Sequence, residues 1–343
     1  MTRGGRRTGL VAAALTLAAA CAAGRIGPAH GSQLIDRNAT DVSLQLNAGG
    51  EALLSYRAHG LTRHVLVWGA VNAAPPSEHV PQVAFQLDYS GGYEKYFKNN
   101  AAARELASEY AKIKGTPGYL ANPIVRKLRE AQRNADLYWQ NAFHGGCGPY
   151  HGPSIAWAVL TCTAPDGSFW AVQQWQRELP DYGEPPGANQ SVWELRISHW
   201  TGQLPQLTVQ TDWAWHRWDH LFGRLTYLGQ PVFGFHSTGS GNPLDSYGRN
   251  VYLDTYDSAY GSGWRRENSV LTHRGTGIFC YSVNPHAGHQ AGKGTRYRVT
   301  VIGPGVTPDV MWEGSAPGPY NAAADRKANQ AIAALHDNLC RPN

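Results

Sequence analysis

Short runs of strand-forming residues, separated by glycine, proline and asparagine, recur along most of this chain of 343 residues. Beyond residue 154 they are 156–163, 169–176, 192–199, 207–213, 221–227, 232–236, 251–255, 278–283 and 296–302. Many short strands joined by such turns are typical of antiparallel sandwiches and barrels. Charged residues make up only 16% of the chain, and the 39 glycines and 21 prolines suit a rigid, loop-rich β protein.

A smaller group of strand signals lies between residues 42 and 87. Its runs are 43–46, 52–57, 64–68 and 83–87. The run 64–68 is largely apolar, as expected for a strand buried on both faces. Because these strands are few and short, we predict that they join the later strands in one β-rich domain of residues 41–343.

Two helical patterns interrupt the strands at about 101–143. The first ends near Gly115, and the second begins with Asn122 as a cap and Pro123 at the first helical position. We expect the pair to cover one sheet, with its charged residues facing solvent. A last helix at about 322–339 has Asn321 as its cap, and its apolar stripe consists of Ala324, Ala328, Ile332, Leu335 and Leu339.

These patterns predict a mainly β fold of the α+β class. Its centre is a large antiparallel β-sandwich or partly closed barrel with an inserted helical pair and a C-terminal helix docked outside. Residues 65–68, 157–160 and 279–283 are expected to contribute core side chains.

The first 24 residues have the order of an export signal. Arg3, Arg6 and Arg7 precede an apolar run at 10–17, which is followed by Ala18–Ala20. The run is too short to span a bilayer as a helix, and residues 25–40 are expected to form a tether. Cys21 and the small residues before it resemble the lipobox of bacterial lipoproteins, which implies lipidation of this cysteine; cleavage after Ala20 or Ala23 explains the same residues.

The net charge is small once this signal is set aside. The chain has 30 Lys and Arg and 25 Asp and Glu, so removing the three signal arginines leaves 27 against 25. No basic stripe is present, so nucleic acid is not an expected partner. A membrane is expected as a partner only through a lipid anchor at Cys21.

Four cysteines follow Cys21, an even number that indicates disulfides in an exported chain. Of three connectivities we favour Cys147–Cys162 and Cys280–Cys340, because the first pair flanks one local segment. The sequence Cys147-Gly148-Pro149 also resembles the start of papain-like cysteine peptidases, which implies a nucleophile at Cys147. A metal site formed by His144, Cys147 and His151 is a further alternative.

The densest group of chemically active residues is the segment 213–220. Its candidate ligand-binding residues are Trp213, Trp215, His216, Arg217, Trp218, Asp219 and His220. In a continuous strand, successive residues would alternate between two faces, each with tryptophan beside polar groups. Such a face could stack on sugar rings, or the tryptophans could fill the sandwich interior. His216 and His220 could hold a metal only if a carboxylate joined them.

A second set of candidates consists of carboxylates that could cleave a glycosidic bond. They are Asp219, Asp254, Asp257 and Glu267. A glycosidase needs two carboxylates about 5–10 Å apart, a separation that the sequence does not supply. His286 and His289 lie in a glycine-containing segment and are expected to be solvated loop residues.

The sequence has no GxGxxG, Walker, GxSxG or HExxH motif, so no cofactor is expected and catalysis is not favoured. The expected function is therefore that of an exported cell-envelope or extracellular binding protein. Its expected partner is an extracellular polysaccharide or cell-wall glycan. The alternatives are a glycan-cleaving hydrolase with paired carboxylates and a purely structural envelope protein.

Overall fold

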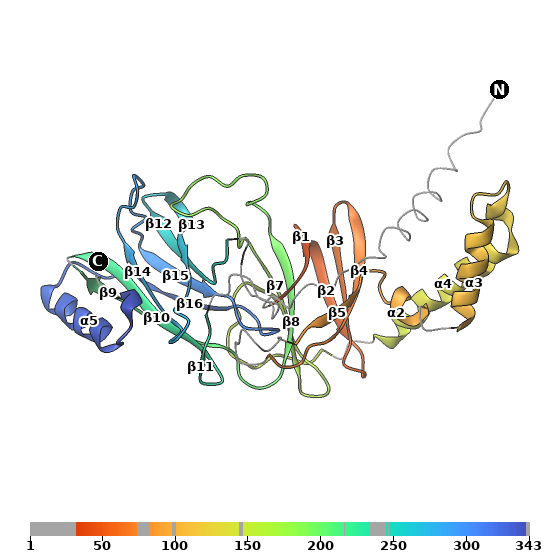
Figure 1. The fold of residues 1–343 in the computed structure, drawn as a ribbon, viewed down its shortest axis with the longest axis horizontal. Helices are drawn as coiled ribbons and strands as arrows, with labels where there is room; N and C mark the ends of the chain where they lie inside the picture. Colours follow the sequence, from red (N-terminus) through yellow and green to blue (C-terminus); the bar gives the residue numbers. More distant parts are fainter. Residues whose placement is uncertain are drawn as a thin grey trace, which may run out of the picture.

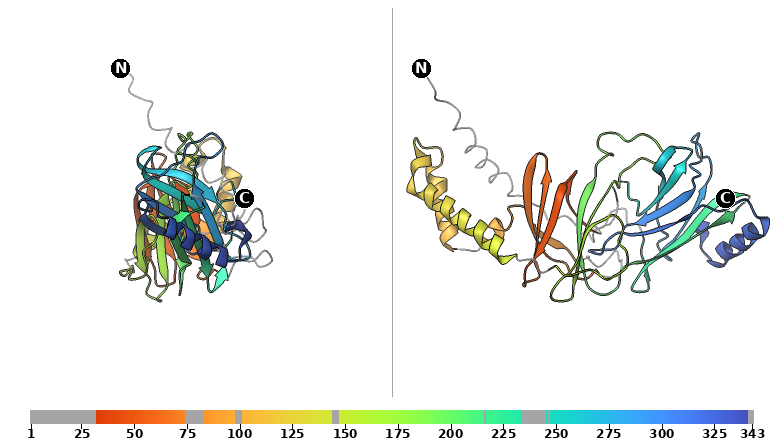
Figure 2. Two further views of the ribbon diagram at one scale, coloured as in Figure 1. Left: turned by 90° about the vertical axis from the view of Figure 1, so that its left-hand side faces the viewer. Right: turned by 180° about the vertical axis from the view of Figure 1, so that it is seen from behind.

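The computed structural model describes residues 32–73, 83–97, 101–143, 147–215, 217–233, 245 and 247–340. These residues form sixteen strands in four antiparallel sheets of four strands each. The molecule is elongated, with a helical hairpin at one end, the sheets in the middle and helix α5 near the other end (Figures 1 and 2). The predicted export signal at 1–24, including Cys21, lies outside the described residues.

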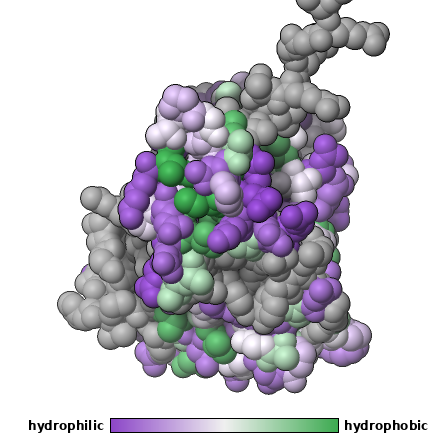
Figure 3. Space-filling model, turned by 90° about the vertical axis from the view of Figure 1, so that its right-hand side faces the viewer, coloured by the Kyte–Doolittle hydropathy of each residue, from purple (hydrophilic) through white to green (hydrophobic). Residues whose placement is uncertain are grey.

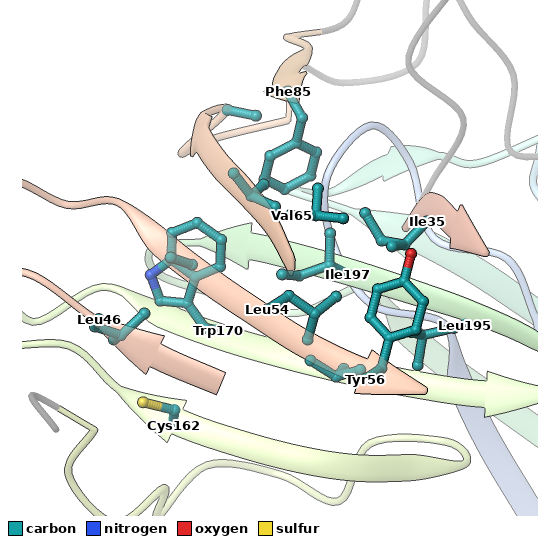
Figure 4. Packing of buried hydrophobic residues seen from close by; sticks show 14 of the residues in the cluster. Ile35, Leu46, Leu54, Tyr56, Val65, Phe85, Cys162, Trp170, Leu195 and Ile197 are labelled. Atoms are coloured by element: carbon teal, nitrogen blue, oxygen red, sulfur yellow. The ribbon is translucent and has the colours of Figure 1, made fainter. Parts of the chain in front are cut away.

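Two of the sheets form a first sandwich. One has the order β2 (Thr40–Leu46), β3 (Ala52–Ala58), β4 (Leu61–Gly69) and β5 (Phe85–Asp88). The other has the order β1 (Gln33–Arg37), β8 (Glu194–Trp200), β7 (Phe169–Trp175) and β6 (Ala158–Thr163). Their facing sides share one core, in which Leu54 and Val65 lie near Trp170 and Ile197 (Figure 4). The early strands thus form their own sheet but bury it against strands from much later in the chain.

The other two sheets form a second sandwich. One has the order β11 (Gln230–Pro231), β10 (Trp218–Tyr227) and β14 (Ile278–Val283), with β9 (Gln206–Ala214) also paired to β10. The other has the order β13 (Gly261–Val270), β12 (Val251–Ser258), β15 (Arg296–Val301) and β16 (Val310–Ser315). The core between them includes Leu221, Phe279, Leu253 and Val299. Strands β9 and β16 contact each other, so the two sheets meet along one edge.

The two sandwiches are joined by a buried polar layer on the second face of β8. Glu194 accepts a hydrogen bond of 2.9 Å from Arg196 Nε and lies 3.8 Å from Arg177 Nε. All three side chains are buried, as is Asp309, which accepts a bond of 3.0 Å from the Trp175 indole. The Trp175 ring also meets Tyr252 of β12 edge to face, at 5.0 Å between centroids. Since buried charges are costly unless paired, this layer favours one arrangement of the two sandwiches.

The inserted helices are α2 (Tyr93–Phe97), α3 (Ala101–Ile113) and α4 (Pro123–Ala142), with a 3-10 turn η1 (Tyr119–Ala121) between the last two. Asn122 caps α4 as predicted, accepting a bond of 2.9 Å from the backbone of Ile124. The expectation that the pair covers a sheet was wrong. The helices contact each other and extend away from the first sandwich (Figures 1 and 2). Phe143, directly after α4, packs on Leu53 and Leu66.

The helical end of the molecule is mostly hydrophilic on its surface, with small separate apolar patches (Figure 3). The charged residues of α4 at 126, 127, 129 and 130 are exposed, in agreement with the sequence prediction. A helix hairpin can bury one face of each helix against the other, so it needs only a small contact with the sheets.

Helix α5 (Ala322–Ala334) docks on the outer face of the β9–β10 sheet, as predicted. Asn321 caps it by accepting bonds from the backbones of Ala323 and Ala324. Ala328 and Ile332 pack with Ala214 and Phe222. The 3-10 turn η2 (Asn338–Cys340) then brings Cys340 to Cys280 of β14.

Both predicted disulfides are confirmed. Cys147 is bonded to Cys162 and Cys280 to Cys340, with Cα atoms 5.1 and 5.4 Å apart. Cys147 is therefore neither a free nucleophile nor a metal ligand in this structure, and both of those alternatives were wrong. No helix within the described ranges has the length and apolarity needed to cross a bilayer.

Three further expectations are corrected. Residues 33–37, expected in the tether, form β1 and pair with β8. The strand expected at 232–236 is replaced by the short β11, which ends at Pro231, and residues 234–236 lie outside the described chain. In the expected core run 157–160, Val159 is 40% exposed, because β6 is an edge strand. The other two core runs contribute buried residues, including Val65, Val67, Phe279 and Val283.

Candidate functional site

The segment 213–220 is a β-hairpin rather than one continuous strand. β9 ends at Ala214 and β10 begins at Trp218, and these two residues are paired, as are Trp213 and Asp219. Trp215 and Arg217 have positive φ angles of 47° and 77°, which reverse the chain between the strands. The expectation of one continuous strand was therefore wrong, although Ala214 and His220 still share one face and Trp213 and Asp219 the other. His216 lies outside the described residues.

The hairpin separates its residues between the two faces of its sheet. Trp213 and Asp219 are on the inner side with the core of the second sandwich, whereas Ala214 and His220 are on the side that α5 covers. Trp215 packs with this outer group, and its backbone N–H donates to Asn329 of α5. Trp215 is therefore largely a packing residue.

His220 is buried on the outer side, with its ring 6.5 Å from Trp215. Neither ring nitrogen has a hydrogen-bond partner among the described residues. Burial therefore lowers the pKa of His220 to about 4, which keeps the ring neutral near pH 7. The described part of the chain holds no group of three or more His, Cys, Asp or Glu that could bind a metal.

Aromatic rings and cations gather at the tip of the hairpin. We call Trp213, Arg217, Trp218, Lys293 and Tyr320 the hairpin-tip cluster. The Trp213 indole donates a bond of 2.8 Å to the carbonyl of Gly318, and its ring meets Tyr320 edge to face at 5.6 Å. Lys293 Nζ lies 4.3 Å above the Trp213 ring and the Arg217 guanidinium 5.1 Å from the Tyr320 ring. Tyr320 and Trp218 are each 39% exposed, but Trp218 pairs with Ala214 and so lies on the opposite face of the sheet from Trp213.

Asp219 lies directly beneath this cluster and is buried. Its Oδ2 accepts a bond of 2.5 Å from the Tyr297 hydroxyl, and its Oδ1 lies 3.4 Å from Lys293 Nζ. Burial, together with this carboxylate, raises the pKa of Tyr297 well above its usual range. Asp219 thus ties the hairpin to β15 and to the segment that carries Lys293.

Glu267 of β13 is the second buried carboxylate at this end of the sandwich. It accepts a bond of 2.8 Å from the Tyr281 hydroxyl, and burial raises its pKa. The backbone at Gly292 lies so close to Glu267 and Tyr260 that a β-carbon there would clash with both. The charge of Glu267 also contributes to the raised pKa of Tyr297, so Asp219 and Glu267 both act on this hydroxyl.

The loop between β14 and β15 covers Glu267. Tyr182 stacks on His289 at 4.8 Å between centroids and lies 5.9 Å from His286. Both histidines lie in a loop, as expected, and are half-buried rather than fully solvated. The backbone N–H of Tyr182 donates to the backbone carbonyl of Glu267, which ties the Tyr182 segment to β13.

The other two candidate carboxylates have structural partners. Asp254 accepts a bond of 2.6 Å from Arg266, and both are buried. Asp257 is exposed near the end of β12, where the pairing with β13 is irregular, and accepts a bond from the backbone of Gly263. Asp219 and Glu267 are therefore the pair that the structure brings to one end of the sandwich.

Sequence reasoning missed a second aromatic surface, on the outer face of the β12–β15 sheet. We call Trp157, Tyr256, Trp264, Arg296 and Arg298 the arginine ladder. Arg298 lies 3.9 Å from the Trp264 ring and 4.4 Å from the Trp157 ring, and Arg296 lies 4.3 Å from the Tyr256 ring and 5.3 Å from that of Trp264. The only sequence signal was the Arg-Tyr-Arg alternation at 296–298, because the rings come from distant segments.

Comparison with known proteins identifies no relative: neither a family model, nor a curated protein, nor a solved structure matches this chain. The class of protein therefore rests on its fold and on the two surfaces described above.

Proposed function

We propose that this protein is an exported binding protein of the cell envelope or extracellular space, and that it binds a carbohydrate at the hairpin-tip cluster. The observation that carries the proposal is the exposed Tyr320 ring against Arg217, with the exposed Trp218 next to Arg217 in the chain. Aromatic rings cover the apolar faces of sugars, while neighbouring polar groups bond to hydroxyls and fix the orientation.

The cluster is supported by rigid structure rather than by a free loop. Trp213 is held by the Gly318 carbonyl, and Asp219 links the hairpin to Tyr297 across the core. Rings fixed in this way lose little conformational entropy when a ligand binds. The disulfides add support for export, because such bonds persist in oxidising compartments. Whether Cys21 is lipidated or removed with the signal belongs to the same proposal.

The test is binding to an array of neutral and charged glycans. Trp218→Ala and Tyr320→Ala are expected to weaken binding about tenfold or more, because each removes a large contact surface. Trp193→Ala is the matched control, since Trp193 is 42% exposed, close to the 39% of Trp218, but lies next to β8 in the first sandwich. Equal binding by all three variants would remove the cluster from the proposal, and binding of no glycan would favour a structural role in the envelope.

Glycan cleavage is a second candidate, and one observation favours it. Asp219 and Glu267 are both buried, and the charge of each acts on the Tyr297 hydroxyl. A carboxyl with a raised pKa, such as Glu267, is suited to donate a proton. Release of reducing ends from a bound glycan, abolished in both Asp219→Asn and Glu267→Gln, would support cleavage. Binding without any product would leave the binding function alone.

A further inference from the structure

The arginine ladder contains one guanidinium with no counter-charge. Arg298 is buried and paired with Glu313, with its Nη2 2.7 Å from the carboxylate. Arg296, two residues earlier, is exposed, and within the described chain its side chain has neither a carboxylate partner nor a hydrogen-bond acceptor. The ladder therefore carries a positive charge that its own residues leave unneutralised.

Arg296 is also held in place. Its guanidinium lies against the Tyr256 ring on the neighbouring strand and near the Trp264 ring one strand further, and these rings are 5.0 Å apart. Stacking fixes the plane of a guanidinium and leaves its N–H groups along the edge free to donate. Two parallel N–H groups match the two oxygens of a carboxylate, so Arg296 is preorganised for a planar anion.

The hairpin-tip cluster adjoins this surface. Lys293 and Arg296 are three residues apart on the same segment, so their Cα atoms are separated by at most about 11 Å. The segment is fixed between them, because Thr295 N–H donates to Tyr256 and Ala316 N–H donates to Thr295. Three exposed cations, Arg217, Lys293 and Arg296, thus lie at one end of the second sandwich.

We infer that the carbohydrate bound at this end is an acidic polysaccharide, with uronic-acid carboxylates bound by Arg296 and sugar faces on the hairpin-tip rings. The inference rests on the proposed carbohydrate binding and names its ligand class.

The experiment compares two polymers with the same backbone. Isothermal titration of the full chain with polygalacturonate and with its fully methyl-esterified form measures how much of the affinity needs the carboxylates. We expect binding to the acid form to be about tenfold or more tighter, the range for charge-assisted hydrogen bonds. Equal affinity for both polymers would overturn the acidic ligand while leaving carbohydrate binding in place. Binding to neither polymer, nor to any neutral glycan, would overturn both.

Variants locate the contact. Arg296→Gln is expected to weaken binding to polygalacturonate about tenfold, and Arg296→Lys to restore little, because lysine keeps the charge but loses the planar pair of donors. Arg265→Gln is the matched control: Arg265 is also exposed and follows Trp264, but strand alternation directs it to the other face. Equal losses in Arg296→Gln and Arg265→Gln would overturn the assignment. So would equal binding of polyglutamate, since charge alone would then suffice.

Discussion

The Tyr297 hydroxyl donates a hydrogen bond to the Asp219 carboxylate across the interior of the second sandwich, at 2.5 Å between the oxygens. The bond joins strands from two different sheets, β10 and β15, at the end that carries the hairpin-tip cluster. A charged oxygen buried there needs such a donor, because water does not reach it. The bond therefore has a structural role that is independent of any ligand.

Tyr297→Phe should destabilise the fold by about 1–3 kcal/mol, the usual cost of leaving a buried acceptor without its donor. Urea unfolding at pH 7 measures the loss. Tyr320→Phe is the control, because the Tyr320 hydroxyl makes no hydrogen bond to the described chain, and it should change the free energy of unfolding little. Equal stability of Tyr297→Phe and the parent would show that the bond contributes nothing.

Glu267 should make the fold less stable as pH rises. Its pKa is raised above the ordinary 4.5 by burial, so the folded state holds the proton where the unfolded state has released it. The stabilisation of the folded state by the protonated Glu267 carboxyl is therefore fully present below pH 4.5, and it is lost as pH rises through the folded-state pKa.

Glu267→Gln removes this titration and keeps an acceptor for the Tyr281 hydroxyl. The variant should gain stability relative to the parent as pH increases from 4 towards 7, measured by urea unfolding at several pH values. Taking the difference between the two proteins cancels the titrating groups that do not interact with Glu267. A constant difference across this range would contradict the expected linkage.

The fold class was predictable because strands and turns leave local patterns in the sequence, and the disulfides were predictable because few pairings are possible. Strand and turn residues alternate at short range, and four cysteines allow only three pairings. β13 was missed because Gly261–Val270 contains several glycines and charged residues. It is stable as a strand because Asp254 of the neighbouring β12 pairs with Arg266. The backbone of Tyr182, far away in the sequence, also donates to the backbone carbonyl of Glu267.

The candidate site was predictable only in part, because most of its contacts also join residues that are distant in the sequence. The segment 213–220 was identified as chemically rich, but its two positive φ angles, at a tryptophan and an arginine, have no glycine or asparagine to mark the turn. Tyr320, Lys293 and the arginine ladder come from four or more separate segments. Register and sheet packing bring them together, and neither quantity is encoded by residue spacing.

His220 should make the protein less stable at mildly acidic pH. Burial lowers its pKa from 6.5 to about 4. Between pH 6.5 and about pH 4, the ring is therefore protonated in the unfolded state but neutral in the folded state. The stability that depends on neutral His220 is fully present above pH 6.5 and decreases as pH falls to about 4. The shift corresponds to a loss of about 3 kcal/mol.

His220→Leu should reduce this loss, because leucine does not titrate and neither ring nitrogen of His220 has a partner to lose among the described residues. Thermal or urea unfolding at pH 7 and pH 4 gives the comparison. His151→Leu, at an exposed position, controls for the change in composition. An unchanged difference between the two pH values in His220→Leu would mean that another group causes the acid sensitivity.

The two disulfides should contribute unequally to stability. In the chain-entropy model the gain grows with the length of the closed loop, and the bonded cysteines are 60 residues apart in Cys280–Cys340 but 15 in Cys147–Cys162. The corresponding contributions are about 4 and about 3 kcal/mol. The larger loop also attaches the end of the C-terminal segment to β14, beside the α5 contact with Ala214 and Phe222. Replacing both cysteines of each pair with alanine and measuring urea unfolding tests this order. A larger loss for the Cys147–Cys162 pair would show that native packing around that bond, rather than loop entropy, dominates its contribution.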